Sequence, residues 1–307
     1  MDARKTHTGL EMKSLPEIRG ELRLGEPMSL HTSFRIGGPA EVFAAPHDVS
    51  DLQVLLYWAQ ANSLPVFVLG AGTNLLVADR GIRGLVVRLG PGFERVRVRG
   101  CEVRAGGAAR VSAVLRKSIR QGLSGLECLA GIPGTIGGAI CMNAGTPDGC
   151  IKDSLESATV LDVQADLHEL PACELGLRYR GSAVWDNRLI IVEAAFRLSS
   201  KESEGINDTV KSLLSERRRS QPVGVRTAGS VFKNPPGGYA GQMLEALGAK
   251  GMQIGGARVS SKHANFIENT GNASAADVRK LIVELQRLAA DRFGVTLEPE
   301  IQMVGEW

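Results

Sequence analysis

The amino-acid sequence predicts a mixed α+β protein with two or three domains. Its 307 residues are more than one hydrophobic core usually takes. Residues 22–89 alternate strand and helix patterns, residues 93–199 are dominated by strand patterns, and residues 206–304 contain helices and a final strand. Strand-rich and helix-rich stretches that follow one another in this way indicate an α+β chain with several compact units.

The first stretch contains a helix between two strands. Ser50 precedes the apolar segment 51–60, and Gln53 follows it by three residues, which is the spacing of a capping box. Residues 65–69 and 85–89 have the apolar pattern of buried strands. This order predicts β-α-β alternation near the N-terminus.

The second stretch contains mostly strands. Apolar and polar residues alternate over 95–104, on both sides of Gly100, which predicts a hairpin. Residues 111–121 predict a helix. Residues 158–163 and 189–196 predict central strands, because they are mostly apolar.

The third stretch contains the longest helices. Residues 206–220 and 241–247 have helical patterns, and Ser274 with Asp277 forms a second capping box. The helix that starts there ends at Gly294, and residues 295–304 predict a final strand.

Composition excludes several classes of protein. The net charge of +3 is too small for a general nucleic-acid binder. The sequence contains no run of about 18 apolar residues, so it predicts no membrane span. The five cysteines contain no C-x-x-C pair, which argues against a disulfide framework or a metal site. Residues 1–20 lack the apolar core of a signal peptide, and we expect them to form a flexible tail. The sequence thus predicts a cytoplasmic protein with reduced thiols.

Two glycine-rich segments are candidate cofactor loops. Residues 69–76, LGAGTNLL, follow a predicted strand, and the backbone amides of such a turn can bind phosphate. A turn needed only for folding gives the same pattern, and the spacing matches neither G-x-G-x-x-G nor the P-loop. Residues 131–139, GIPGTIGGA, suit a backbone that lies against a flat or phosphorylated ligand. Two such loops fit one extended dinucleotide better than two unrelated turns.

The segment 228–235, AGSVFKNP, combines a hydroxyl, a cation and an amide. Ser230 is a candidate nucleophile or proton donor, but no G-x-S-x-G elbow surrounds it. Lys233 and Asn234 suit a phosphate and a polar group, although an ordinary loop has the same composition. Glu300 lies in a predicted apolar strand, where a carboxylate needs a partner or a function.

Together these segments resemble the UDP-N-acetylenolpyruvoylglucosamine reductase (MurB) family of peptidoglycan synthesis. The set of blocks in this order is specific to the family, whereas each block alone has little specificity. The short route from Phe196 to Gly229 resembles the family's shorter subtype, and segments 146–150 and 181–184 depart from the family pattern. The matching blocks are residues 32–38, 69–77, 125–139, Tyr179–Arg180 with Ser182, 229–235, 263–266 and 297–301.

The resemblance implies a two-part FAD-binding region of the vanillyl-alcohol-oxidase (PCMH) type and a C-terminal α+β substrate-binding domain. We expect FAD-binding subdomains at residues 21–92 and 93–204 and the substrate-binding domain at 205–307. The final strand, at 295–307, would carry Glu300 to the active site.

The resemblance also implies a reaction. NADPH would reduce non-covalent FAD, and UDP-N-acetylglucosamine enolpyruvate would then be reduced to UDP-N-acetylmuramate. This oxidoreductase serves peptidoglycan precursor synthesis, and with it cell-wall biogenesis, cell shape and cell division. We expect a monomer without a metal, a nucleic-acid partner or membrane insertion.

The resemblance assigns roles to individual residues. Arg180 and Glu300 would stabilise the negative charge of the transition state, and Ser230 would donate the proton. The cofactor would contact Gly70, Ala71, Gly72, Thr73, Asn74, Leu75, Gly131, Ile132, Pro133, Gly134, Ile136, Gly137, Gly138, Asn143 and Ala144. The substrate would contact Tyr179, Arg218, Gln221, Lys233, Asn234 and Tyr239.

Two other functions are compatible with part of this pattern. An oxidase of the same flavin fold would have similar loops and often tethers FAD through histidine or cysteine. A nucleotide-binding protein without catalysis would keep the glycine loops but would need neither Ser230 nor Glu300.

Overall fold

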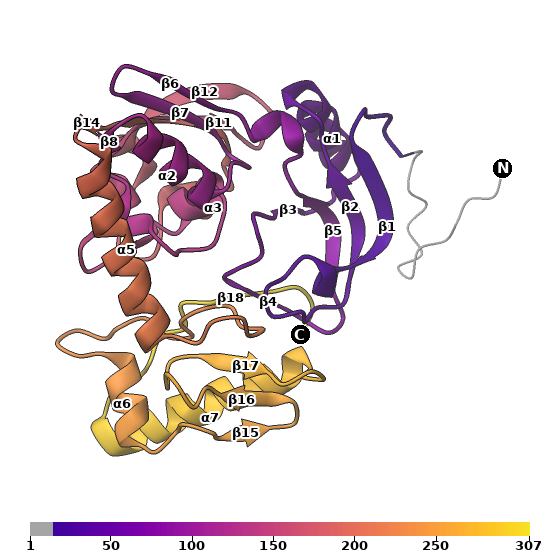
Figure 1. The fold of residues 1–307 in the computed structure, drawn as a ribbon. Helices are drawn as coiled ribbons and strands as arrows, with labels where there is room; N and C mark the ends of the chain where they lie inside the picture. Colours follow the sequence, from indigo (N-terminus) through magenta and orange to yellow (C-terminus); the bar gives the residue numbers. More distant parts are fainter. Residues whose placement is uncertain (1–14) are drawn as a thin grey trace.

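The computed structural model describes residues 15–307, which form three units in chain order (Figure 1). Of the predicted tail, residues 1–14 lie outside the described part. Arg19 lies 2.5 Å from the carboxylate of Asp48, and the backbone N–H of Gly20 donates to Asp51 over 3.0 Å. These two residues of the predicted tail are therefore anchored to the first unit.

The first unit contains a mixed four-stranded sheet in the order β1-β2-β5-β3, covered by α1. β1 is antiparallel to β2, and β5 is parallel to both β2 and β3. Its elements are β1 (Glu21–Pro27), β2 (Pro39–Ala45), α1 (Val49–Ala61), β3 (Val66–Val68), β4 (Leu75–Val77) and β5 (Ile82–Val87).

The helix α1 begins earlier than its sequence predicts. Its N-cap is Asp48, whose carboxylate accepts from the N–H groups of Ser50 and Asp51, so the capping box predicted at Ser50 is wrong. Asp48 lies in extended backbone directly before the helix, where a carboxylate can reach two free N–H groups. The strand β3 is also only half-buried, not buried as expected.

The second unit is an antiparallel five-stranded sheet in the order β12-β11-β13-β7-β6, with α2 and α3 packed against it. The predicted hairpin and both predicted central strands are confirmed. The elements are β6 (Val96–Arg99), β7 (Glu102–Gly106), α2 (Val111–Arg120), β8 (Leu123–Ser124), α3 (Ile136–Cys141), β9 (Gly145–Thr146), β10 (Gly149–Cys150), β11 (Leu155–Leu161), β12 (Leu167–Pro171), α4 (Ala183–Asp186), β13 (Ile190–Arg197) and β14 (Ser199–Ser200).

The third unit packs a three-stranded sheet, β15-β16-β17, against the long helix α7. The capping box of Ser274 and Asp277 is confirmed, and Gly294 ends the helix in the left-handed conformation. The elements are α6 (Ala240–Ala246), β15 (Gln253–Ile254), β16 (Ala257–Val259), β17 (Ile267–Asn269), α7 (Ala275–Phe293) and β18 (Gln302–Val304).

Two segments cross the divisions expected from the sequence. The helix α5 (Ser203–Ser220) packs against the second unit, because Ile206 and Val210 lie in its core, so the division expected at residue 205 does not follow the packing. The final strand is also much shorter than 295–304, because only Gln302–Val304 forms a strand and Pro299 contributes an isolated bridge to Phe232. Its remaining part, β18, pairs in parallel with β4 of the first unit.

The hydrophobic cores also cross unit boundaries. Phe34 and Leu76 of the first unit lie in the core of the third. Leu161 and Ile190 of the second unit lie in the core beneath α1. The three units are therefore held together by shared apolar packing, which fixes the walls of the space between them.

Candidate active site

A large cavity lies where the three units meet. Its volume is about 1450 Å³, and it is lined by the segment 69–75, most of 131–139, Arg180, Ser230 and Glu300. Ordinary ligand sites measure roughly 300–1,000 Å³. The cavity is therefore large enough for an extended dinucleotide together with a second ligand.

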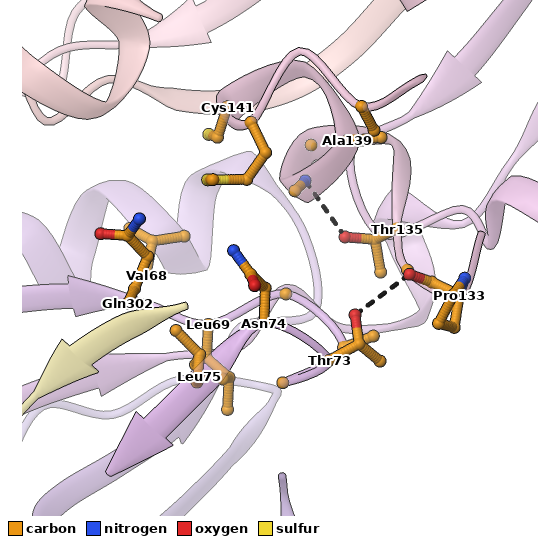
Figure 2. Close-up of a pocket in the computed structure, with 18 of the residues that line it drawn as sticks. Val68, Leu69, Thr73, Asn74, Leu75, Pro133, Thr135, Ala139, Cys141 and Gln302 are labelled. Carbon is orange, nitrogen blue, oxygen red and sulfur yellow. Dashed lines mark hydrogen bonds between the residues drawn. The ribbon is translucent and has the colours of Figure 1, made fainter. Parts of the chain in front are cut away.

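The two glycine loops face each other across one end of the cavity (Figure 2). The hydroxyl of Thr73 donates to the carbonyl of Pro133 over 3.0 Å, which joins the loops directly. Thr135 caps α3 by accepting from the N–H of Gly138 at 3.3 Å. A Cβ at Gly134 would meet no described protein atom closer than the Thr73 hydroxyl at 3.8 Å, so backbone faces open space there. This cradle suits a flat or phosphorylated ligand.

Most of the residues that the sequence assigned to the cofactor line this cavity. They are Gly70, Ala71, Gly72, Thr73, Asn74, Leu75, Gly131, Ile132, Pro133, Gly134, Gly137, Gly138 and Ala144.

Ile136 and Asn143 do not line the cavity. Ile136 is fully buried in the core of the second unit. Asn143 donates to the carbonyl of Arg178 over 3.1 Å and accepts from the N–H of Lys152 at 3.4 Å. Its φ of 41° is left-handed, a conformation that asparagine tolerates. We therefore predict that both side chains contribute to the structure of the loop, because each contacts the protein around it.

The three predicted catalytic residues lie together in the cavity wall. The Nε of Arg180 lies 2.8 Å from Oε1 of Glu300, with side chains only 22% and 17% exposed. A further N–H of Arg180 donates to the carbonyl of Gly145 over 3.1 Å, and its guanidinium lies 5.2 Å from the ring centre of Tyr179. No well-directed acceptor satisfies the buried Nε within residues 15–307. The contact between Arg180 and Glu300 is therefore a close charge pair in which the Nε–H points poorly toward the carboxylate oxygen.

Burial controls the protonation of Glu300. Burial raises the pKa of this carboxyl, and the nearby charges of Arg180 and Lys233 oppose that rise only in part. Glu300 therefore keeps its proton to higher pH than an ordinary glutamic acid and can donate a hydrogen bond. Its own backbone N–H donates to the carbonyl of Val231 over 2.7 Å, which fixes it to the segment of Ser230.

The predicted substrate residues divide into two groups. Arg218 and Gln221 line the cavity, and the other four do not. The hydroxyl of Tyr179 accepts from the backbone N–H of Asn234 at 3.4 Å. The ammonium of Lys233 lies 2.5 Å from the carboxylate of Glu298.

The second group thus gathers close to the cavity rather than in its wall. Asn234 accepts from the N–H of Ala240 at the start of α6 over 3.1 Å. Tyr239, the N-cap residue of that helix, is 57% exposed. Tyr179, Lys233 and Asn234 are therefore brought together, while Tyr239 stands on the surface beside them.

The sequence did not single out Arg217. This residue lines the cavity beside Gly131, and burial together with the charge of Arg180 lowers its pKa. Residues 217–219 are three consecutive arginines, and consecutive side chains point in different directions from a helix. The basic run is therefore visible in the sequence, but only the orientation of α5 shows that Arg217 as well as Arg218 lines the cavity.

Cys141 is the cysteine that lines the cavity in the described part of the chain. Burial raises the pKa of its thiol to about 12, so it stays protonated and unreactive. No histidine lines the cavity in that part.

Residues 15–307 contain no cluster of three His, Cys, Asp or Glu side chains arranged to hold a metal ion. The helices within that range are also too short or too polar to cross a membrane.

Comparison with known proteins identifies the family. An FAD-binding domain model matches residues 40–170, and the model of the UDP-N-acetylenolpyruvoylglucosamine reductase C-terminal domain matches residues 221–304. The chain is 40% identical over 296 residues to the UDP-N-acetylenolpyruvoylglucosamine reductase of Desulforamulus reducens, covering 96% of this chain and 97% of that protein. The chain belongs to this family. The reductase of Agathobacter rectalis is 43% identical over 310 residues, covering 96% and 98%.

A solved structure confirms the fold that the family resemblance implies for this chain. The crystal structure of the reductase from Thermus caldophilus superimposes with a TM-score of 0.82 at 33% identity, and covers 94% of this chain and 99% of its own. The fold is thus an FAD-binding region of the PCMH type followed by the C-terminal domain of this reductase family.

Proposed function

We propose that Arg180, Ser230 and Glu300 carry out the substrate step of the reaction that defines this family. The chain is an FAD-dependent UDP-N-acetylmuramate dehydrogenase, which uses NADPH in peptidoglycan precursor synthesis. It reduces UDP-N-acetylglucosamine enolpyruvate to UDP-N-acetylmuramate. The Arg180–Glu300 pair, which lines the same cavity as the two joined glycine loops, is the observation that supports the proposal most strongly.

The glycine loops fit FAD, since they turn backbone rather than side chains toward the cavity. When bound, FAD accepts hydride from NADPH and passes it to the substrate. The residues around it favour a non-covalent complex, because the Cys141 thiol is held protonated and is a poor nucleophile.

The protein's own groups meet the demands of hydride addition. Addition at the methylene carbon leaves negative charge on the adjacent carbon and on the carboxylate. The Arg180 guanidinium balances that charge, and protonated Glu300 donates a hydrogen bond to it. The Ser230 hydroxyl then gives its proton to the adjacent carbon.

The sugar nucleotide binds through the remaining residues. Arg218 and Gln221, together with Arg217, offer guanidinium and amide groups to the diphosphate from the end of α5. Lys233, Asn234 and Tyr239 contact the nucleotide or the sugar from the loop before α6, and Tyr179 does so from the segment before α4. We further propose that the protein works as a monomer in the cytoplasm; sedimentation at micromolar concentration checks the monomer.

Stopped-flow spectroscopy of the two half-reactions tests this function. NADPH should bleach the flavin, and UDP-N-acetylglucosamine enolpyruvate should restore its absorbance far faster than air does. Rapid reoxidation by air without response to the enolpyruvyl substrate would identify an oxidase instead. Acid precipitation should release the flavin into the supernatant, and a flavin that stays with the pellet would contradict non-covalent binding.

A further inference from the structure

The segment that carries Ser230 is held between two neighbouring segments of the third unit. On one side, Ser230 pairs with Phe266, and the N–H of Val231 donates to the carbonyl of Asn265 over 2.9 Å. On the other side, the N–H of Lys233 donates to the carbonyl of Glu298 over 2.8 Å. The segment 230–233 therefore behaves as the middle strand of a short, irregular sheet.

The side chain of Asn265 completes this pairing. Its Oδ1 accepts from the N–H of Phe232 at 2.9 Å, and its Nδ2 donates to the carbonyl of Phe232 over 2.8 Å. Asn265 is only 4% exposed. One amide thus satisfies both backbone groups of one residue, which requires a donor and an acceptor side by side.

A backbone strand cannot supply these two bonds here because the chain turns away. The N–H of Phe266 donates to the carbonyl of His263 over 3.0 Å, and the N–H of Asn265 donates to the ring of His263 over 3.1 Å. The N–H groups of Asn265 and Phe266 are therefore engaged within their own turn, while the carbonyl of Asn265 accepts from Val231. Gly229, next to Ser230, has a φ of 82°, a left-handed conformation that favours glycine, and Ala228 before it is buried in the core of the third unit.

We propose that Asn265 is a positioning residue that fixes the segment 230–233 so that the Ser230 hydroxyl faces the substrate. The proposal rests on the proton-donor role of Ser230 stated above. Val231 gives the same segment a bond to Glu300, because its carbonyl accepts from the Glu300 N–H at 2.7 Å. Asn265 thereby also sets the position of Ser230 relative to the Arg180–Glu300 pair.

Asn265→Asp tests the proposal, because an ionised carboxylate accepts from Phe232 N–H but cannot donate to its carbonyl. The substrate-dependent reoxidation should fall about 10- to 100-fold, since a small misplacement of a catalytic group has effects of this size. Flavin reduction by NADPH, which needs no hydroxyl at Ser230, should stay within about twofold of the unaltered protein.

Protonation of the carboxyl introduced by Asn265→Asp restores a donor, which gives the test a second readout. The ratio of reoxidation rates, variant to unaltered protein, should rise as pH falls. The neighbouring titratable groups His263, Lys233, Glu298 and Glu300 are present in both proteins, so the ratio isolates the new carboxyl. Asn265→Ser, which cannot bridge both groups, should show the selective loss without recovery at low pH.

Asn269→Asp is the matched control. Asn269 is another buried amide of the same unit, but it donates to the carbonyl of Phe34 over 2.9 Å and accepts from Gly271 and Ala273. Asn269→Asp should lower the melting temperature, and any change in rate should be equal for flavin reduction and for substrate-dependent reoxidation.

Three results would overturn the positioning role. They are equal slowing of both half-reactions by the Asn265 variants, the same selective loss in Asn269→Asp, and unchanged reoxidation in folded, flavin-loaded Asn265 variants. If Ser230→Ala leaves reoxidation unchanged, the donor role itself fails. If Ser230→Ala is slow and the Asn265 variants are not, only the positioning role fails.

Discussion

The guanidinium of Arg180, from the second unit, lies 2.8 Å from the carboxyl of Glu300, which enters from the C-terminal segment. Asn74, from the first unit, also contacts Glu300, because its Nδ2 donates to the carbonyl of Glu300 over 3.1 Å. The proposed catalytic arrangement therefore forms only when all three units pack together.

Replacing Glu300 should change the pH dependence of the substrate step. The pKa of Glu300 is raised, so its protonated form persists above the ordinary range and is lost as pH rises through the shifted value. The reoxidation rate should fall over that interval in the unaltered protein. Glu300→Gln stays neutral and should lack this decrease, whereas Glu300→Ala should be slower by about 100- to 1000-fold. Stopped-flow measurement of the reoxidation rate across pH checks both outcomes, with the rate of flavin reduction by NADPH as the internal reference.

Ser230→Ala should slow one half-reaction and leave the other unchanged. Reoxidation by the enolpyruvyl substrate should fall by about 100- to 1000-fold, because the variant lacks the proton donor, and flavin reduction by NADPH should persist. Ser118→Ala serves as a control, since Ser118 is buried in α2 away from the cavity and donates to Val114. Equal reoxidation rates in Ser230→Ala and the unaltered protein would remove Ser230 from the mechanism.

Thr73→Val should weaken FAD binding. The substitution removes the hydroxyl that joins the two glycine loops at Pro133 and keeps the side-chain shape. One hydrogen bond contributes about 1 kcal/mol, so the dissociation constant of FAD should rise about fivefold. Titration of flavin fluorescence measures it. Thr209→Val, on the exposed face of α5, should leave the constant unchanged.

Asn143 should prove structural. Asn143→Ala removes bonds to Arg178 and Lys152 and places alanine at a φ of 41°, so the free energy of unfolding should fall by about 1–3 kcal/mol. Asn143→Gly loses the same bonds without the backbone strain and should be less destabilised. Chemical denaturation of the flavin-free protein measures this order. Equal stability of both variants and the unaltered protein, with weaker FAD binding, would instead support direct contact of Asn143 with the cofactor.

Elements with a local cause were predictable from sequence. The capping box at Ser274 and the stop at Gly294 depend on neighbouring residues, and both are present. At α1 two capping residues compete within three positions, and Asp48 caps the helix rather than Ser50. The length of the final strand depended on its partner strand in the first unit, which pattern alone does not reveal.

The sequence by itself determined the family, the two glycine loops and the catalytic residue types, because ordered blocks and backbone-permissive glycines are written directly in the chain. Only the tertiary structure decided which side chains reach the cavity. It turned Arg217 inward beside Arg218, set Asn143 and Ile136 beneath the loop, and used Asn265 to hold the segment of Ser230. These outcomes depend on how α5 and the three cores pack, and contacts between distant segments leave no local signature in the sequence.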